Sequence, residues 1–204
     1  MSQTLEMFYD FSSPYAYIGH RHAAEVAAAA GATFVPRPFL LGGLFKSLKS
    51  AIVPIQEATP QKRRVLELDI YRQAELHGLP LQWPTRFPMN TILALRVALQ
   101  FEGQQHLDVM SALFGAYWAE DQDLADPATV HAVISKLGLD ADATLLGCQR
   151  PEIKDALRIN TEEALARGAI GAPAFFVGNL HVWGQDRLLD VVPRMLQGWR
   201  PKYG

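Results

Sequence analysis

The sequence predicts an α/β fold in which a β-α-β unit and a β-β-α unit flank a long helical block. Strand-like runs rich in aromatic and β-branched residues lie only near the two ends of the chain, at 5–11, 32–38 and 174–183. The residues between them show helical spacing of apolar side chains and no strand pattern. A chain of 204 residues can bury a large core, as one domain or as a domain that carries an insertion.

The first unit begins with an apolar, aromatic-rich run, Leu5–Phe11, which predicts a buried strand. Ser12 and Ser13 are N-cap candidates and Pro14 suits the first helical position, so a helix is expected to follow as far as Ala30. This turn places Ser13 where unpaired backbone N–H groups and the positive end of the helix dipole converge. Such a position favours an anion or an ionising thiol, although a simple capping role would also explain Ser13.

The second strand, at 32–38, closes the β-α-β unit, and a right-handed crossover predicts that it pairs in parallel with the first. Pro36 and Pro38 cannot donate to a ladder, which predicts an edge position or pairing of the first half only. The apolar segment Phe39–Lys46 follows as a loop that is expected to line a cavity, with a short helix as the alternative.

Helices are predicted through the middle of the chain from the spacing of apolar residues and from cap and stop signals. They cover residues 61–78, 91–98, 105–119, 127–137, 140–148 and 151–167. The prolines at 80, 84 and 88 predict an extended connection between the first two of these helices. Trp83 and Phe87 in this connection, like Tyr15, are expected to line a pocket or the core.

Strand character returns at Ala174–Val177 and Leu180–Trp183, and Gly178-Asn179 between them predicts a hairpin. A last helix is predicted over Gln185–Leu196. Together the end units form a four-stranded mixed sheet with helices on its faces, which is the thioredoxin arrangement with a helical block inserted. The predicted boundaries are 1–45 and 165–204 for the thioredoxin-like domain and 46–164 for the inserted helical domain.

Composition narrows the possible functions. A net charge of −2 gives no electrostatic case for nucleic-acid binding, and no apolar run approaches the length of a membrane span. Met1–Thr4 has no basic region and no long apolar stretch, so we expect no secretory signal. We therefore expect a cytoplasmic location. The single cysteine, Cys148, excludes an intrachain disulfide and a cysteine-rich metal site, and the histidines show no metal-ligand spacing. We expect Cys148 to be an inert buried thiol.

The fold brings the two ends of the chain together. In a thioredoxin-like sheet the first helix begins beside the loop before the third strand, here Ile170–Pro173, and a cis peptide is expected at Ala172-Pro173. The backbone of Ala172 is then expected to pair with an extended peptide. Thiol-disulfide enzymes of this fold carry Cys-x-x-Cys at the helix start, but this chain has Ser13-Pro14-Tyr15-Ala16. Dithiol exchange is therefore excluded, and glutathione is the expected source of a thiol.

Three stretches add a further signal, and they span essentially the whole chain in order. They are Phe8–Tyr15, Phe87–Thr91, and Gly171–Pro173 with Trp183–Leu188. Together they resemble the 2-hydroxychromene-2-carboxylate isomerases, bacterial relatives of the kappa-class glutathione transferases. The resemblance implies a glutathione-dependent isomerase of aromatic degradation that acts on a small aromatic carboxylate and forms a homodimer.

The resemblance also implies how glutathione binds. Ser13 would donate a hydrogen bond to the glutathione sulfur and favour its thiolate. Ala172, held before Pro173, would pair through its backbone with the cysteinyl part. Gln185 and Asp186 match family positions that hold the γ-glutamyl end, where Asp186 suits the ammonium group.

Further positions follow from the same resemblance. Lys62 matches the family lysine that meets the glycyl carboxylate, and Lys46 and Asn160 match positions near the second substrate. Two alternatives stay open, namely that Lys46 is a solvated loop lysine and that Asn160 caps its own helix. The family often has a Gly-Asn pair after the Lys46 position, where this chain has Ser47–Ala51, so Ser50 is the candidate replacement.

The implied reaction interconverts 2-hydroxychromene-2-carboxylate and trans-o-hydroxybenzylidenepyruvate. The glutathione thiolate would add to the unsaturated carbon of the ring-opened form, allow rotation about the new single bond, and leave again, which is nucleophilic catalysis with a borrowed nucleophile. Two other functions stay open. One is a kappa-type glutathione transferase that conjugates electrophiles, and the other is a non-enzymatic thiol- or peptide-binding module that uses the Ala172 edge.

Overall fold

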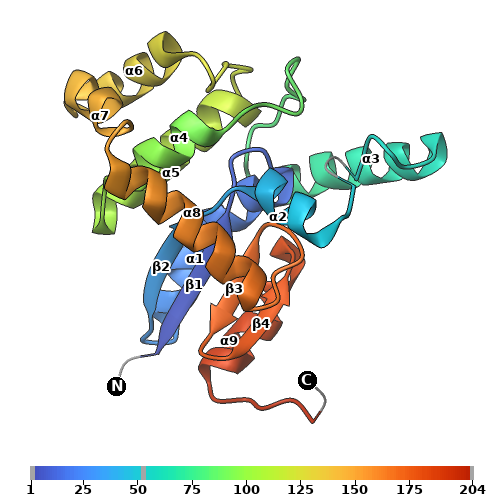
Figure 1. Ribbon diagram of the computed structural model, residues 1–204. Helices are drawn as coiled ribbons and strands as arrows, with labels where there is room; N and C mark the ends of the chain where they lie inside the picture. The colour runs from blue at the N-terminus through green and yellow to red at the C-terminus, as the bar shows by residue number, and fades with distance from the viewer. Residues whose placement is uncertain (1–2, 52–53, 203–204) are drawn as a thin grey trace.

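The computed structural model describes residues 3–51 and 54–202, and its element order confirms the predicted α/β fold (Figure 1). A β-α-β unit comes first, a helical block follows, and a β-hairpin with a short helix ends the chain. The elements are β1 (Thr4–Tyr9), α1 (Pro14–Ala29), β2 (Thr33–Pro38), α2 (Leu41–Leu48), α3 (Pro60–Leu76), α4 (Ile92–Ala98), α5 (Gly103–Trp118), α6 (Pro127–Lys136), α7 (Ala141–Gly147), α8 (Pro151–Ala166), β3 (Ala174–Val177), β4 (Leu180–Trp183), the 3₁₀ turn η1 (Gln185–Arg187) and α9 (Val191–Leu196).

The strands form one mixed sheet in the order β2-β1-β3-β4. β1 pairs in parallel with β2 and antiparallel with β3, and β3 forms the predicted hairpin with β4. The prediction that β2 lies at an edge is confirmed, as its prolines require. Its register with β1 continues from Thr33 to Pro38, so the alternative that only its first half pairs is wrong.

The two faces of β1 carry different side chains, because successive residues of a strand point in opposite directions. Phe8 packs edge-on against Phe176 of β3, and the guanidinium of Arg167 lies over both rings at the end of α8. Arg167 also forms an ion pair with Glu6 at 2.6 Å. Helix α8 is therefore fixed across this face of the sheet, where Figure 1 shows it running in front of the strands.

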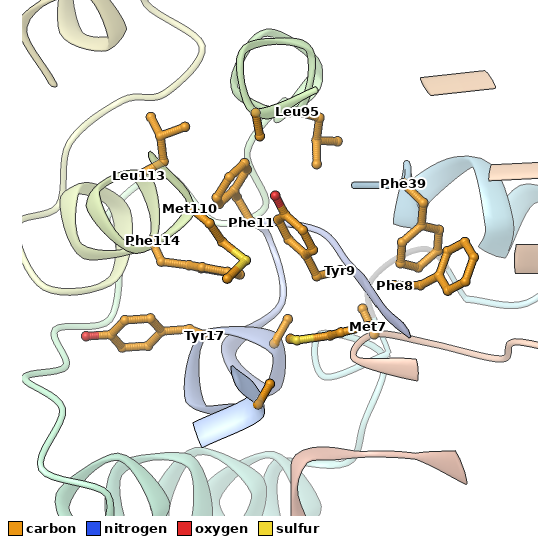
Figure 2. Packing of buried hydrophobic residues seen from close by; sticks show 14 of the residues in the cluster. Met7, Phe8, Tyr9, Phe11, Tyr17, Phe39, Leu95, Met110, Leu113 and Phe114 are labelled. Carbon is orange, nitrogen blue, oxygen red and sulfur yellow. The ribbon is translucent and has the colours of Figure 1, made fainter. Parts of the chain in front are cut away.

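The sheet and the helical block share one hydrophobic core. Tyr9 of β1 lies 5.8 Å from Phe114 of α5, and Phe11 lies 4.8 Å from the same ring. Figure 2 shows that Tyr17 of α1 lies on the side of Phe114 away from Phe11. Leu113 and Met110, from the same helix as Phe114, lie near the Phe114 side chain. One continuous cluster of buried side chains reaches from Leu5 to Leu196. The domain boundaries at 45/46 and 164/165 stay a prediction.

The last predicted helix differs from the structure. Residues 185–196 were expected to form one helix, but they divide into the 3₁₀ turn η1 and the separate helix α9. Pro193 explains the division, because a proline fits only the first turn of a helix and α9 therefore cannot begin much before it. Leu189, which lies between η1 and α9, is 53% exposed.

The structure also tests two further expectations from the sequence. Most of the apolar segment Phe39–Lys46 belongs to a short helix, α2, which begins at Leu41, so the alternative is confirmed. Within the described residues, no helix combines the length and the apolar character needed to cross a membrane.

Candidate functional site

The two ends of the chain meet at Ser13. Ser13 is the N-cap of α1, with Pro14 as the first helical residue, and its Oγ accepts a hydrogen bond from the N–H of Ala16 at 3.2 Å. The same hydroxyl donates to the carbonyl oxygen of Ala172 at 2.8 Å. The Ala172-Pro173 peptide is cis, as the fold predicts. The predicted neighbourhood of the helix start and this loop is therefore confirmed.

A buried carboxylate holds the turn that carries Ser13. Oδ1 of Asp10 accepts hydrogen bonds from the N–H and the hydroxyl of Ser12, at 2.9 and 3.0 Å, and from the Thr91 hydroxyl at 2.7 Å. Its Oδ2 accepts from the N–H of Leu41 at 2.8 Å. Asp10 is 1% exposed, and burial raises the pKa of its carboxyl although these donors oppose the rise. One side chain thus ties the end of β1 to the starts of α2 and α4.

Sequence reasoning gave Asp10 no role. The available signal was an acidic residue at the end of a largely apolar strand, two positions before the cap candidates Ser12 and Ser13. A carboxylate in that position needs several donors, because burying it without them is costly. Two of the donors come from residues far along the chain, which is why the local pattern did not identify them.

A cavity of about 660 Å³ opens at Ser13. This volume is within the range of small-molecule binding sites. Its lining comes from the start of α1, from α2, from α3 and the segment before it, from the connection before α4, from the loop before β3, and from the end of β4 with η1. The residues are Ser12–Tyr15, Leu41, Phe45, Pro54, Ile55, Lys62, Leu66, Asp69, Ile70, Gln73, Trp83, Phe87, Pro88, Gly171, Ala172 and Trp183–Arg187.

Most of the residues predicted to bind glutathione meet in this cavity. Ser13, Lys62, Ala172, Gln185 and Asp186 all line it. Gln185 is 8% exposed, so its amide is a largely buried polar group of the lining. The cavity therefore gathers a hydroxyl, an ammonium, an amide and a carboxylate from three distant parts of the chain.

Pro173 lies directly behind this lining. A Cβ added at Gly19 of α1 would come within 3.3 Å of the Pro173 ring and 3.4 Å of the Gln185 Cβ. Glycine at this position lets α1 approach the cis-proline loop and η1 closely.

The structure does not bring Lys46 and Asn160 to the cavity. Lys46 is exposed, as the alternative interpretation expected, but it lies in the last turn of α2 and not in a loop, and it is absent from the lining. Asn160 is buried in the middle of α8, where its Nδ2 donates to the carbonyl of Pro38 at 2.9 Å. The cap interpretation of Asn160 is therefore wrong, since α8 begins nine residues earlier, at Pro151. Ser50, the candidate replacement for the family asparagine, is also exposed and outside the lining.

Sequence reasoning missed two charged residues of the cavity, Asp69 and Arg187. Asp69 shares a face of α3 with Lys62, Leu66 and Gln73, since residues three and four apart lie on the same side of a helix. That spacing was readable, but only the packing of α3 shows that this face turns toward Ser13. Arg187 directly follows Asp186 in η1, and their charged groups are 3.6 Å apart.

The charges in the lining balance. Two cations, Lys62 and Arg187, stand with two carboxylates, Asp69 and Asp186, among the described residues of the cavity. Burial raises the pKa of the Tyr15 phenol, and the negative charges of Asp69 and Asp186 raise it further. Tyr15 therefore keeps its proton at neutral pH. Near Ser13, the start of the 16-residue helix α1 supplies positive potential.

Cys148 is separate from this site. Its thiol is buried, donates to the Thr144 carbonyl at 3.4 Å and accepts from the Gln100 amide at 3.3 Å. The expected burial of Cys148 is confirmed, and burial raises the pKa of its thiol, which disfavours the reactive thiolate. Within the described part of the chain, no group of three or more His, Cys, Asp or Glu residues is arranged to hold a metal ion.

Comparison with known proteins agrees with this geometry. A family model described as a DSBA-like thioredoxin domain matches residues 4–195. A 2-hydroxychromene-2-carboxylate isomerase from Sphingobium xenophagum is 27% identical over 92% of this chain and 95% of its own length. Glutathione S-transferase kappa 2 from Caenorhabditis elegans is 25% identical over 93% of this chain and 90% of its own length. A solved 2-hydroxychromene-2-carboxylate isomerase superimposes with a TM-score of 0.82 over 95% of both chains, at 24% identity.

Proposed function

Since the chain belongs to the DSBA-like thioredoxin domain family, we propose that it is a glutathione-dependent isomerase that acts on a conjugated aromatic compound. The observation that carries the proposal is the Ser13 hydroxyl beside the Ala172 carbonyl, at the edge of a cavity without a cysteine. The family similarity to 2-hydroxychromene-2-carboxylate isomerases and kappa glutathione transferases supports the choice of ligand. The interconversion of 2-hydroxychromene-2-carboxylate and trans-o-hydroxybenzylidenepyruvate is the first reaction to test.

Glutathione has charges that match those of the cavity. Its two carboxylates would face Lys62 and Arg187, and its ammonium group would face Asp186, with the Gln185 amide beside it. The cysteinyl part would then lie against Ala172, which places the sulfur near Ser13. Charge-assisted hydrogen bonds of this kind are the stronger ones in proteins.

Ser13 would act on the sulfur as a hydrogen-bond donor. Its hydroxyl proton now points to the Ala172 carbonyl oxygen in a hydrogen bond, so rotation of the hydroxyl would redirect that proton toward the thiolate. The positive end of α1 adds to the stabilisation of the anion. We propose that this lowers the pKa of the bound thiol and makes it a nucleophile at neutral pH.

The reaction then needs no other cofactor. The thiolate forms an S–C bond with the electrophilic carbon of the conjugated double bond, and the electron pair of that double bond moves onto the carbonyl oxygen. The former double bond is now single and rotates. When the electron pair returns, the S–C bond breaks and the thiolate is regenerated, so glutathione is not consumed.

A second candidate function is a kappa-type glutathione transferase. The apolar side of the cavity, with Phe45, Trp83 and Phe87, suits a range of aromatic electrophiles and favours this alternative. A transferase retains the S–C bond in its product and therefore consumes glutathione. Stoichiometry distinguishes the two functions.

Location and assembly belong to the same proposal. A cytoplasmic location agrees with the use of reduced glutathione, and the family resemblance implies a homodimer. Sedimentation at several protein concentrations tests whether the protein forms this homodimer.

The test combines binding with turnover. Calorimetry should show glutathione binding, and S-methylglutathione, which has no ionisable thiol, should bind but support no reaction. With trans-o-hydroxybenzylidenepyruvate, the enzyme should isomerise the substrate only in the presence of glutathione, while the free thiol concentration stays constant. Loss of free thiol would identify the transferase. Binding without any turnover would leave a thiol-binding module, and no binding would contradict the proposal.

A further inference from the structure

Helix α3 forms one wall of the cavity and is attached to α1 by few buried side chains. It contributes five residues to the lining, namely Lys62, Leu66, Asp69, Ile70 and Gln73. The buried residues of α3, Ile70 and Ala74, join Ile18 of α1 in a small cluster apart from the main core. Partly buried side chains such as Leu79 and Trp83 pack against both clusters. The position of this wall therefore depends on a short contact between α1 and α3.

Two histidines lie at one end of this contact. On α1, His22 follows Ile18 by one turn, and His77 is the C-cap residue of α3, three residues after Ala74. The two ring centroids are 5.1 Å apart, and the ring planes are tilted by 59°. Both side chains are only partly buried, and that of His22 is 25% exposed. Protons from the solvent can therefore reach both rings while the rings are in contact.

On the α1 side, one carboxylate serves two cations. Nδ1 of His22 donates to the Glu25 carboxylate at 3.0 Å, and Arg21 forms an ion pair with the same carboxylate at 3.2 Å. His20 lies deeper on this helix, and burial lowers its pKa to about 4, so it stays neutral at the pH values at which an ordinary histidine titrates. The charges of α1 next to His77 are therefore those of Arg21, His22 and Glu25.

On the α3 side, His77 has no carboxylate beside it. In the last two turns of this helix the other charged residues are Arg72 and Glu75, and helical spacing directs both to the exposed side, away from Ala74 and α1. The segment that follows, 78–81, has no charged residue. Burial lowers the pKa of the His77 imidazole, and the positive charge of His22 lowers it further.

Protonation of both rings weakens the contact. It places two positive charges side by side, and the Glu25 carboxylate, which Arg21 already shares, compensates only one of them. The pKa of His77 is lower in the folded protein than in the unfolded chain. The stability that neutral His77 contributes is therefore complete above about pH 6.5 and is lost as the pH falls.

We propose that His22 and His77 form an acid-sensitive contact that controls how firmly α3 closes the wall of the cavity. While at most one ring is charged, the rings stay packed and the end of α3 is held against α1. When both rings are charged they repel each other, and the last two turns of α3 move away from α1. Ile70 and Gln73 belong to these turns and line the cavity, so acid opens the wall on that side and weakens the binding of a ligand.

Hydrogen exchange tests the contact without any ligand. The protection factors of the amides in residues 70–77 should fall by about fivefold between about pH 7 and about pH 5.5, as expected when two charges this close repel each other near water. The fall should be smaller at high salt, which screens the repulsion. Unchanged protection of these residues, or a fall that salt does not reduce, would overturn the proposal.

Three variants assign the effect to the pair. His77→Gln and His22→Gln each leave one titratable ring in the contact, so the fall in protection of residues 70–77 should be lost in both. His131→Gln is the matched control, because His131 also pairs with a carboxylate, that of Asp142 at 3.2 Å, but lies on α6, which Figure 1 shows far from α3. It should behave as the wild type. A fall that persists in either of the first two variants, or that His131→Gln also abolishes, would overturn the proposal.

The consequence for binding rests on the proposed use of glutathione. The carboxylates and the ammonium group of S-methylglutathione keep their charges between about pH 5.5 and about pH 7. Calorimetry should give a dissociation constant about fivefold higher at the lower pH for the wild type and His131→Gln, and an unchanged one for His77→Gln. Equal weakening in the wild type and His77→Gln would overturn the link to the cavity. If S-methylglutathione does not bind at either pH, the proposed function is wrong, while hydrogen exchange still decides whether the histidine contact is acid-sensitive.

Discussion

The hydroxyl of Ser13 donates to the carbonyl oxygen of Ala172 at 2.8 Å, across 159 positions of the chain. This bond joins the start of α1 to the loop before β3, and it uses the one proton that the serine can donate. A ligand sulfur at this corner must therefore compete with a backbone carbonyl for that proton. The competition makes the contribution of Ser13 measurable.

Ser13→Ala should leave the tripeptide bound but its sulfur less acidic. We expect the pKa of the bound thiol to rise by about one unit and turnover to fall by about 100-fold, because one preorganised donor to an anion is lost. Ultraviolet absorbance of the thiolate against pH measures the first effect. Ser13→Thr keeps a hydroxyl and should restore most of both. An unchanged thiol pKa in Ser13→Ala would assign Ser13 to capping alone.

Lys62 and Lys46 form a natural pair for testing which lysine meets the ligand. Lys62→Gln should raise the dissociation constant for glutathione by about tenfold and weaken its salt dependence, since a charge-assisted contact in the cavity is removed. Lys46→Gln changes an exposed residue outside the lining and should leave both the glutathione affinity and the substrate KM unaltered. A raised KM in Lys46→Gln would support the role that the family resemblance implies for this residue.

Asn160→Ala separates a structural role from substrate binding. The Asn160 amide is the donor to the buried Pro38 carbonyl at 2.9 Å, so its removal should lower the free energy of unfolding by about 1–3 kcal/mol. The KM of the folded variant should match the wild type. Urea denaturation and steady-state kinetics on the same preparation distinguish the structural role from a role in substrate binding. A raised KM at unchanged stability would contradict this assignment.

Asp10→Asn should disturb the turn beneath Ser13. An asparagine keeps one oxygen acceptor but presents an NH₂ group, and one of the N–H donors now bonded to Asp10 would then lose its acceptor. The expected loss of stability is about 1–3 kcal/mol. Thr91→Val removes a single donor from the same carboxylate and should cost less. Thermal denaturation compares the two variants, and the reverse order would show that Asp10 does not organise this turn.

The buried side chain of His20 should make the stability of the protein depend on pH. It stacks on Phe114 at 4.8 Å, and burial lowers its pKa to about 4. The unfolded chain binds the proton near pH 6.5, so the stability contributed by neutral His20 is complete above that pH and is lost as the pH falls toward 4. The full loss is about 3 kcal/mol. The unfolding free energy of His20→Phe should decrease less over this pH range than that of the wild type. Parallel curves of unfolding free energy against pH for the two proteins would refute this role of His20.

The local patterns predicted the parts of the fold that depend on neighbouring residues. The cap at Ser13, the hairpin at Gly178-Asn179 and the helices of the central block all follow from short stretches of sequence. The break before α9 was not predicted, because the apolar spacing around Pro193 indicated one continuous helix.

The site was predictable where topology or family resemblance supplied the contact, and not elsewhere. The fold places Ser13 beside Ala172, but no local signal shows that α3 turns Asp69 into the cavity. The partner of Asn160 lies 122 positions away, so its burial could not be read from its own helix. Side chains whose role depends on a distant partner need the tertiary structure.

The absence of sulfur from the described lining has a consequence for the response to oxidants. Neither cysteine nor methionine contributes to it, and Cys148 is buried elsewhere. Peroxide converts a catalytic cysteine to sulfenic acid, whereas a serine hydroxyl offers it no comparable target. On the proposed function, oxidative stress would therefore slow the enzyme by draining the cellular supply of reduced tripeptide. Refilling that supply would restore activity without repair of the polypeptide.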